Sequence, residues 1–138
     1  MAALLLDTCA IIFIADGQAI DRSAEQLIKT ASLTDGVLVS PVSAWEIGLL
    51  ATKRAIAFKP DPKAWFRAFI AYPGVRLTPL TAEIAIDSCF LPASSQLQAD
   101  PADRLLIATA RALGVPIVTW DRRILNYAQA GSVAAIPC

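Results

Sequence analysis

Short apolar runs alternate with longer segments of helical period along the chain, and this alternation constrains the fold more than any other feature. It is typical of β-α-β units, in which parallel strands share one sheet and helices pack against it. Strands are predicted at Ala3–Leu6, Val37–Val39, Val75–Leu77, Ile117–Thr119 and Val133–Ile136. Helices are predicted at Thr8–Ile14, Ser23–Leu33, Pro41–Thr52, Pro62–Ala71, Ala82–Phe90, Pro101–Leu113 and Arg122–Ala128. The expected fold class is therefore α/β, with a mainly parallel sheet.

Several helix ends carry chemical signals that do not depend on hydropathy. Ser40, Asp61 and Asp100 each precede a proline. A side-chain oxygen just before a helix accepts a hydrogen bond from a free backbone N–H, and proline suits the first helical position because it lacks the N–H that would have no partner there. Gly114 and Pro116 mark a helix end, because glycine adopts the left-handed conformation that closes a helix and proline does not continue it.

Length and composition limit the organisation of the chain. We expect a single domain over residues 1–138, because two cores of useful size need a longer chain. Hydrophobic residues make up 56% of the chain and charged residues 17%, so apolar side chains should remain on the surface and favour self-association or a protein partner. Twelve basic residues balance twelve acidic ones, so any contact with nucleic acid must be local.

The cysteines and the hydropathy of the chain indicate a cytoplasmic location. Cys9, Cys89 and Cys138 form no C-x-x-C pair and are odd in number, which fits reduced thiols better than a framework of disulfides. No apolar run approaches the length needed to cross a bilayer, so no membrane association is expected.

Five carboxylates are expected to meet at one edge of the sheet. Asp7 directly follows the first predicted strand, Glu46 lies in the helix after the second, and Asp121 follows the fourth. Asp100 and Asp103 open the helix that returns to the fourth strand. In right-handed β-α-β units the carboxyl ends of the strands and the starts of the following helices share one edge, which is where ligands bind.

Each of these acids taken alone also has a purely structural explanation. Asp and Glu stabilise helix N-termini through capping and through the helix dipole. Asp100 and Asp103 can be a capped helix start. Ser43 and Glu46 match a capping box, although Pro41 indicates that their helix begins earlier. Carboxylates that lie together, however, repel one another and raise one another's pKa unless a cation neutralises them.

The residue types favour a hard divalent cation at this edge. The candidate ligands are all carboxylates, the chain has no histidine, and its cysteines lack the spacing of a zinc site. Mg²⁺ and Mn²⁺ prefer such oxygen ligands. The sequence therefore predicts a Mg²⁺ or Mn²⁺ site and disfavours zinc.

Four blocks of sequence carry a family resemblance. They are LLLDTCAII, SAWEIGLL, DPADRLLIATA and VTWDRRIL, which follow one another between Leu4 and Leu125. Together they resemble the PIN domain family, specifically the VapC-type toxins of bacterial toxin–antitoxin pairs. The resemblance implies a three-layer α/β/α sandwich and a Mg²⁺- or Mn²⁺-dependent endoribonuclease. It also implies a homodimer that is inhibited by an antitoxin protein.

The resemblance implies roles for single residues as well. By position, the metal-binding and catalytic acids of the family fall on Asp7, Glu46, Asp103 and Asp121, the last of which varies within the family. Supporting positions fall on Thr8, Asp100 and Thr119. We expect Asp7 and Asp103 to hold the principal metal ion, and the other two acids to bind through water or to complete a second site. A metal-activated water would then attack the RNA phosphate.

Basic and aromatic side chains accompany the acids. Arg104, Arg122 and Arg123 can bind RNA phosphates through their planar guanidinium groups, although each can equally be a solvated charge on a helix face. Trp45 and Trp120 adjoin site acids, and we interpret both as walls of the fold rather than as substrate contacts.

Two further apolar groups have alternative interpretations. Trp65, Phe66, Phe69 and Tyr72 can stack on bases, but their helical spacing favours a packing face. Phe13, Ile14, Leu49 and Leu50 can belong to a groove for an apolar antitoxin segment or to the core.

Two other classes of protein remain as alternatives. A phosphotransfer or phosphatase domain also has an aspartate after its first strand, but the sequence Asp7-Thr8-Cys9 lacks the second aspartate of that pattern. A non-catalytic interaction module on the same fold would keep its helix caps and lose only metal affinity.

Overall fold

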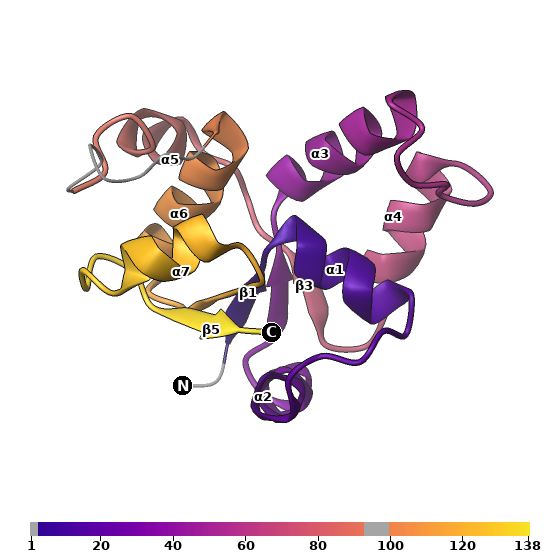
Figure 1. Cartoon of the computed structure of the whole chain (residues 1–138), viewed down its shortest axis with the longest axis horizontal. Coiled ribbons are helices and arrows are strands. Elements are labelled where there is room, and N and C mark those ends of the chain that lie inside the picture. The colour runs from indigo at the N-terminus through magenta and orange to yellow at the C-terminus, as the bar shows by residue number, and fades with distance from the viewer. Residues whose placement is uncertain (1–2, 93–99) are drawn as a thin grey trace.

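Five parallel strands form a single sheet in the computed structural model of the chain, which describes residues 3–92 and 100–138 (Figure 1). The strands are β1 (Leu4–Leu6), β2 (Val37–Val39), β3 (Val75–Leu77), β4 (Ile117–Thr119) and β5 (Ala135–Pro137), and their order in the sheet is β3-β2-β1-β4-β5. Each neighbouring pair is parallel; Leu5 of β1, for example, lies opposite Leu38 on one side and Ile117 on the other. The predicted parallel sheet is confirmed.

The helices follow the predicted bounds closely. They are α1 (Thr8–Ala15), α2 (Arg22–Leu33), α3 (Pro41–Thr52), α4 (Pro62–Ile70), α5 (Ala82–Asp87), α6 (Pro101–Leu113) and α7 (Arg122–Ala128). The predicted caps are present: Ser40, Asp61 and Asp100 each accept a backbone N–H at the start of their helix, and Gly114 closes α6 with a φ of 66°. The capping signals therefore account for the starts of α3, α4 and α6 and for the end of α6.

Two predicted elements differ from the structure by more than one residue at an end. Helix α5 stops at Asp87 rather than Phe90, because the last residues form single turns, with the N–H of Phe90 bonded to the carbonyl of Asp87. Strand β5 begins at Ala135 rather than Val133, because it pairs only with the three residues of β4. Val133 is nevertheless buried in the core, so its apolar character reflects burial and not strand structure.

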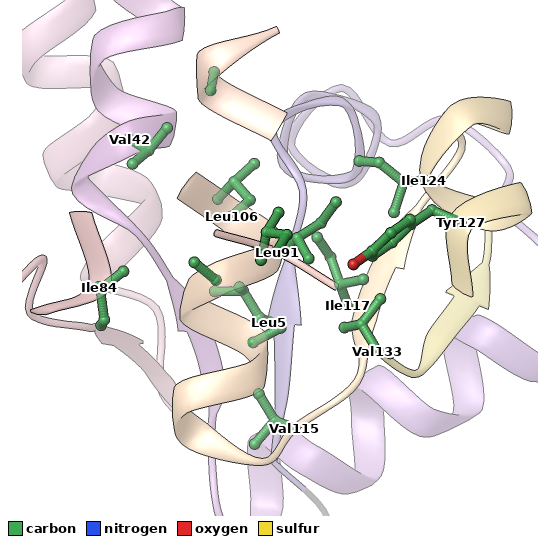
Figure 2. Packing of buried hydrophobic residues seen from close by; sticks show 14 residues of the cluster. Leu5, Val42, Ile84, Leu91, Leu106, Val115, Ile117, Ile124, Tyr127 and Val133 are labelled. Atoms are coloured by element: carbon green, nitrogen blue, oxygen red, sulfur yellow. The ribbon is translucent and has the colours of Figure 1, made fainter. Parts of the chain in front are cut away.

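Helices cover both faces of the sheet. Leu5 and Ile117 belong to a core on one face, whereas Leu4, Leu6 and Val118 belong to a core on the other. To the first core, α5, α6 and α7 contribute Ile84, Leu106, Ile124 and Tyr127 (Figure 2), and α6 also contributes Ile107. To the second core, α1, α2 and α4 contribute Ala10, Ile11, Ala31 and Phe69. The implied three-layer α/β/α sandwich is confirmed.

Helix α3 is tied to α1 and α4 by a third cluster of apolar residues. Ile47 of α3 packs with Ile12 of α1 and with Phe58 of the loop before α4. In α4, Trp65 stacks on Phe69 with ring centroids 6.3 Å apart, which confirms the packing interpretation for Trp65, Phe66 and Phe69. Tyr72 lies beyond the end of α4 and is 64% exposed, so it is not part of this buried packing face. This arrangement brings the start of α3 next to the start of α1.

The order of the strands creates a switch point at the centre of the sheet. β2 and β3 lie on one side of β1, and β4 and β5 lie on the other. At such a point the connections leave the sheet in opposite directions and open a crevice at the carboxyl ends of the strands. None of the helices in the described ranges combines the length and apolar character needed to span a bilayer.

Candidate active site

Asp7 directly follows strand β1 and is almost fully buried, with 5% of the residue exposed. Its Oδ1 accepts a hydrogen bond from the backbone N–H of Thr8 at 2.7 Å. Its Oδ2 accepts one from the Thr119 hydroxyl at 2.6 Å and one from the Cys9 thiol at 3.5 Å. Burial raises the pKa of Asp7, and the hydrogen bonds from Thr119 and Thr8 oppose that rise.

Thr119 connects Asp7 to the acid that follows β4. Its hydroxyl donates to Asp7 and accepts a hydrogen bond from the backbone N–H of Asp121 at 2.9 Å. Since a hydroxyl has a single proton, these two bonds fix its orientation. Thr119 is fully buried, so water does not compete for either bond. The side chain thereby aligns the ends of β1 and β4.

Glu46 reaches the site from the interior of α3. Ser40 caps this helix, so Glu46 lies beyond its first turn, and the capping-box interpretation of Ser43 and Glu46 is wrong. Instead, Oε1 of Glu46 accepts a hydrogen bond from the Thr8 hydroxyl at 2.5 Å, and the same hydroxyl lies 2.9 Å from the hydroxyl of Ser43. Burial raises the pKa of Glu46; the hydrogen bond from Thr8 opposes this, and the charges of neighbouring acids add to it.

Asp103 has a buried carboxylate oxygen that lacks a hydrogen-bond partner. Asp100 caps α6 by accepting the backbone N–H of Asp103 at 2.9 Å. The residue Asp103 is 5% exposed, and its Oδ2 forms no hydrogen bond with the described part of the chain. Burial, reinforced by the charges of Asp100, Asp7 and the other acids, raises the pKa of Asp103 to about 7. A buried oxygen in this state is costly unless a cation or a donor binds to it.

Arg123 of α7 forms ion pairs with two of the acids, Asp103 and Asp121. Its Nη2 donates to Oδ2 of Asp121 at 3.0 Å and its Nε to Oδ1 of the same residue at 3.3 Å. The same Nη2 lies 3.7 Å from Oδ2 of Asp103, which is within ion-pair range but too long for a hydrogen bond. Burial by itself raises the pKa of Asp121, but the hydrogen bonds and the charge of Arg123 outweigh it and lower the pKa.

All five predicted carboxylates line one cavity of about 720 Å³. Among the predicted site residues, the cavity is lined by Asp7, Thr8, Glu46, Asp100, Asp103, Asp121, Arg122 and Arg123. Thr119 does not line the cavity; it contacts the site through the hydrogen bond that its hydroxyl donates to Asp7. Arg104 does not line it either, although it follows Asp103 in α6.

A family model decides the relationship of this chain to known proteins. The model of the PIN domain matches residues 4–130. The chain belongs to the PIN domain family. Ribonuclease VapC22 of Mycobacterium tuberculosis is 32% identical to this PIN domain over 128 residues, which are 92% of this chain and 93% of that protein. The resemblance to the VapC ribonucleases is thereby confirmed.

Solved structures share the fold of this PIN domain. The crystal structure of VapBC2 from Rickettsia felis, bound to a DNA fragment from its promoter, matches with a TM-score of 0.73 and 12% identity over 98% of each chain. The crystal structure of VapBC-5 from Mycobacterium tuberculosis, a member of the VapBC family of toxin–antitoxin systems, matches with a TM-score of 0.61 and 20% identity over 100% of each chain. At these identities the likeness extends to the fold alone.

The donor set of this PIN domain fits a hard divalent cation. Its acids offer only oxygen atoms, and the buried Oδ2 of Asp103 has no hydrogen-bond partner among the described residues. Within the described ranges, no three His, Cys, Asp or Glu side chains lie close enough to hold a metal ion together. Glu46 is engaged by Thr8, and Asp121 by Arg123, so these two acids must exchange partners to become ligands.

Both tryptophans are exposed, so their interpretation as buried walls of the fold is wrong, and whether either contacts substrate stays a prediction. Trp45 is 53% exposed and Trp120 is 65% exposed, and Trp120 also lines the cavity of the PIN domain. Its position directly between Thr119 and Asp121 is the sequence signal that could have identified it, because that position lies just beyond the buried part of β4.

Proposed function

We propose that this PIN domain is a Mg²⁺- or Mn²⁺-dependent endoribonuclease and the toxin of a toxin–antitoxin pair. The observation that carries the proposal is the convergence of four acids on one cavity, where a buried oxygen of Asp103 lacks a partner. A ribonuclease in the same family, VapC22, supports the choice of RNA as substrate.

Asp7 and Asp103 hold the principal metal ion in this proposal. Both are almost fully buried at the switch point of the sheet, and both have a raised pKa, so a cation relieves the cost of their ionised forms. Glu46 and Asp121 would bind it through water or complete a second site. A divalent cation held there would lower the pKa of a bound water molecule and stabilise negative charge on the phosphate oxygens.

Hydroxyl side chains orient two of the acids, and the neighbouring residues take part in proton transfer and in binding phosphate. Thr119 holds Oδ2 of Asp7, and Thr8 holds Oε1 of Glu46. Glu46 is placed to accept the proton of the attacking water, because its carboxylate lines the cavity beside Asp7 and Asp103. Arg122 and Arg123 line the cavity and bind phosphate oxygens, which requires Arg123 to leave Asp121.

The partners of the enzyme are part of the same proposal. Leu33, Ile86 and Phe90 are 83%, 60% and 78% exposed, and large apolar side chains on a surface favour contact with another protein. We propose a cytoplasmic homodimer that binds an antitoxin. The groove proposed for the apolar antitoxin segment includes Phe13, Ile14, Leu49 and Leu50. Phe13 and Leu50 line the cavity, and Ile14 and Leu50 also pack against the core clusters.

Cleavage of total cellular RNA by the purified protein tests this function. Cleavage is expected with Mg²⁺ or Mn²⁺ and not with EDTA. Asp7→Asn and Asp103→Asn are expected to abolish it. Glu83→Gln is the matched control, because Glu83 is an exposed acid of α5 outside the cavity and should leave cleavage unchanged. Absence of cleavage under every condition, by folded and antitoxin-free protein, would favour the non-catalytic interaction module.

A further inference from the structure

Trp120 presents an exposed indole ring on the wall of the acid-lined cavity. It stands between Thr119, which donates to Asp7, and Asp121, which accepts from Arg123. The residue is 65% exposed and lines the same cavity as the acids. It belongs to none of the apolar clusters that form the core. Its aromatic surface therefore faces the place where the proposed substrate binds.

The surroundings of Trp120 hold the ring in position. The carbonyl of Thr119 accepts a hydrogen bond from the backbone N–H of Cys138 at 3.1 Å, and the backbone N–H of Asp121 is bound to the Thr119 hydroxyl. The Phe13 ring meets the indole with centroids 5.6 Å apart and an interplanar angle of 74°. This edge-to-face contact supports the indole without covering it with a parallel ring.

We propose that Trp120 stacks on an unpaired base of the RNA beside the phosphate that is cut. The inference rests on the proposed ribonuclease function and names a contact for its substrate. Bases of single-stranded RNA splay out and stack on aromatic side chains, whereas paired bases are stacked within their own helix. Every base has a π-face, so the contact selects unpaired RNA without reading a fixed sequence.

Arg122 supplies a positive charge beside this stacking surface. It is the first residue of α7, it is exposed, and it lines the cavity. In residues 3–92 and 100–138 it takes part in no ion pair, whereas Arg123 pairs with Asp121 and Asp103. A guanidinium next to an aromatic ring suits a phosphate and its adjoining base. An apolar protein segment would use the ring and not the charge.

A double-mutant cycle between the ring and the bases tests the proposal. Binding of a short, fluorescein-labelled single-stranded RNA is measured by anisotropy in the Asp103→Asn background, where no cleavage is expected. Trp120→Ala is expected to weaken binding about tenfold and Trp120→Phe much less. Each base is then removed in turn by abasic substitution. At one position, loss of the base should weaken binding about tenfold with Trp120 present and hardly at all with Trp120→Ala.

The controls separate stacking from other causes. Trp45→Ala should leave RNA binding unchanged, because Trp45 is also half-exposed but lies outside the cavity. Trp120→Leu, which keeps an apolar side chain without a π-face, replaces Trp120→Ala if that variant fails to fold. Equal losses from every base removal in both proteins would overturn the proposal. So would unchanged RNA binding by Trp120→Ala together with weaker binding of the antitoxin.

Failure of the stacking proposal is distinguishable from failure of the proposed function. The unsubstituted protein is tested for Mg²⁺-dependent RNA cleavage in parallel. Cleavage without coupling between Trp120 and any base overturns the stacking contact and leaves the ribonuclease in place. Absence of both cleavage and RNA binding overturns the proposed function, and the stacking contact with it.

Discussion

The two halves of the acidic cavity hold their carboxylates in different ways. In the hydrogen-bonded half, Asp7 accepts bonds from Thr8, Thr119 and Cys9, and Glu46 accepts one from Thr8. The charge-paired half is made of Asp103, Asp121 and Arg123. Within residues 3–92 and 100–138, Oδ2 of Asp103 accepts no hydrogen bond, and the Asp121 side chain is paired with Arg123. Hydrogen bonds within the folded chain therefore fix the carboxylates of the hydrogen-bonded half, whereas the carboxylates of the charge-paired half are stabilised by a positive charge.

This difference indicates how a metal ion would change each half. The hydrogen-bonded half presents Asp7 in a fixed orientation before any ion arrives, which lowers the cost of ordering a ligand. The charge-paired half has a buried oxygen that a cation would satisfy and a guanidinium that a cation would replace. Substitutions in the two halves should therefore have different effects on the stability of the metal-free protein.

Asp103→Asn should produce the largest change and should separate activity from stability. Metal-dependent cleavage is expected to fall by about 10³-fold, because a metal ligand supports several kcal/mol of transition-state stabilisation. Thermal unfolding in EDTA at pH 8 should nevertheless shift to higher temperature, because the substitution removes a buried charge that has no hydrogen-bond partner at Oδ2. Asp7→Asn should lose cleavage equally but should lower the unfolding temperature, because its carboxylate accepts bonds from Thr8 and Thr119. A matching rise for Asp7→Asn would remove the distinction between the halves.

The stability of the metal-free protein should fall as pH rises from about 4 to about 7. The pKa of Asp103 is about 7 in the folded protein and near 3.8 in the unfolded chain, so the folded state holds more protons in this range. The free energy of unfolding then decreases with pH, by about 1–4 kcal/mol. Urea unfolding in EDTA at several pH values measures this slope. Asp103→Asn should flatten it, and a slope of the same size in that variant would assign the effect to other acids.

Thr119→Val tests the hydrogen-bonded half without changing the shape or charge of the side chain. It leaves Oδ2 of Asp7 without the bond from Thr119 and the backbone N–H of Asp121 without an acceptor. Unfolding should become easier by about 1–3 kcal/mol, and cleavage should fall about 10–100-fold. Thr119→Ser keeps the hydroxyl and should restore most of both losses. Equal behaviour of the two variants would mean that packing, and not the hydrogen bond, is responsible.

Within the hydrogen-bonded half, the place of Asp7 was predictable from the sequence, because it obeys a local chemical rule. Asp7 directly follows an apolar run and caps a helix. Such signals depend only on neighbours in the chain. The pairing of Thr8 with Glu46 was not predictable, because it depends on how α3 packs against α1 through Ile47.

The charge-paired half was predictable only in part, because two arginines are adjacent in its sequence and the sequence does not show which of them pairs with the acids. Arg122 and Arg123 look alike in sequence, and only the start of α7 decides that Arg123 turns towards Asp121. The exposure of Trp120 was missed for a related reason. Three buried residues of β4 precede it, and an apolar residue at the end of such a run suggests core unless the end of the strand is known.

Arg123→Gln should give the smallest effect, a gain in Mg²⁺ affinity. Arg123 places a positive charge 3.7 Å from Oδ2 of Asp103 and engages Asp121, so it competes with a metal ion for both acids. Its side chain is 53% exposed, and exposed ion pairs contribute about 0–1 kcal/mol, so the gain should not exceed about fivefold. Isothermal titration of Mg²⁺ into the protein without RNA measures it. Arg122→Gln is the control with the same change of charge, and it should alter Mg²⁺ affinity less because Arg122 pairs with neither acid in the described residues. Equal gains from both variants would show that the general positive field at the mouth of the cavity matters, and that the contacts made by Arg123 do not.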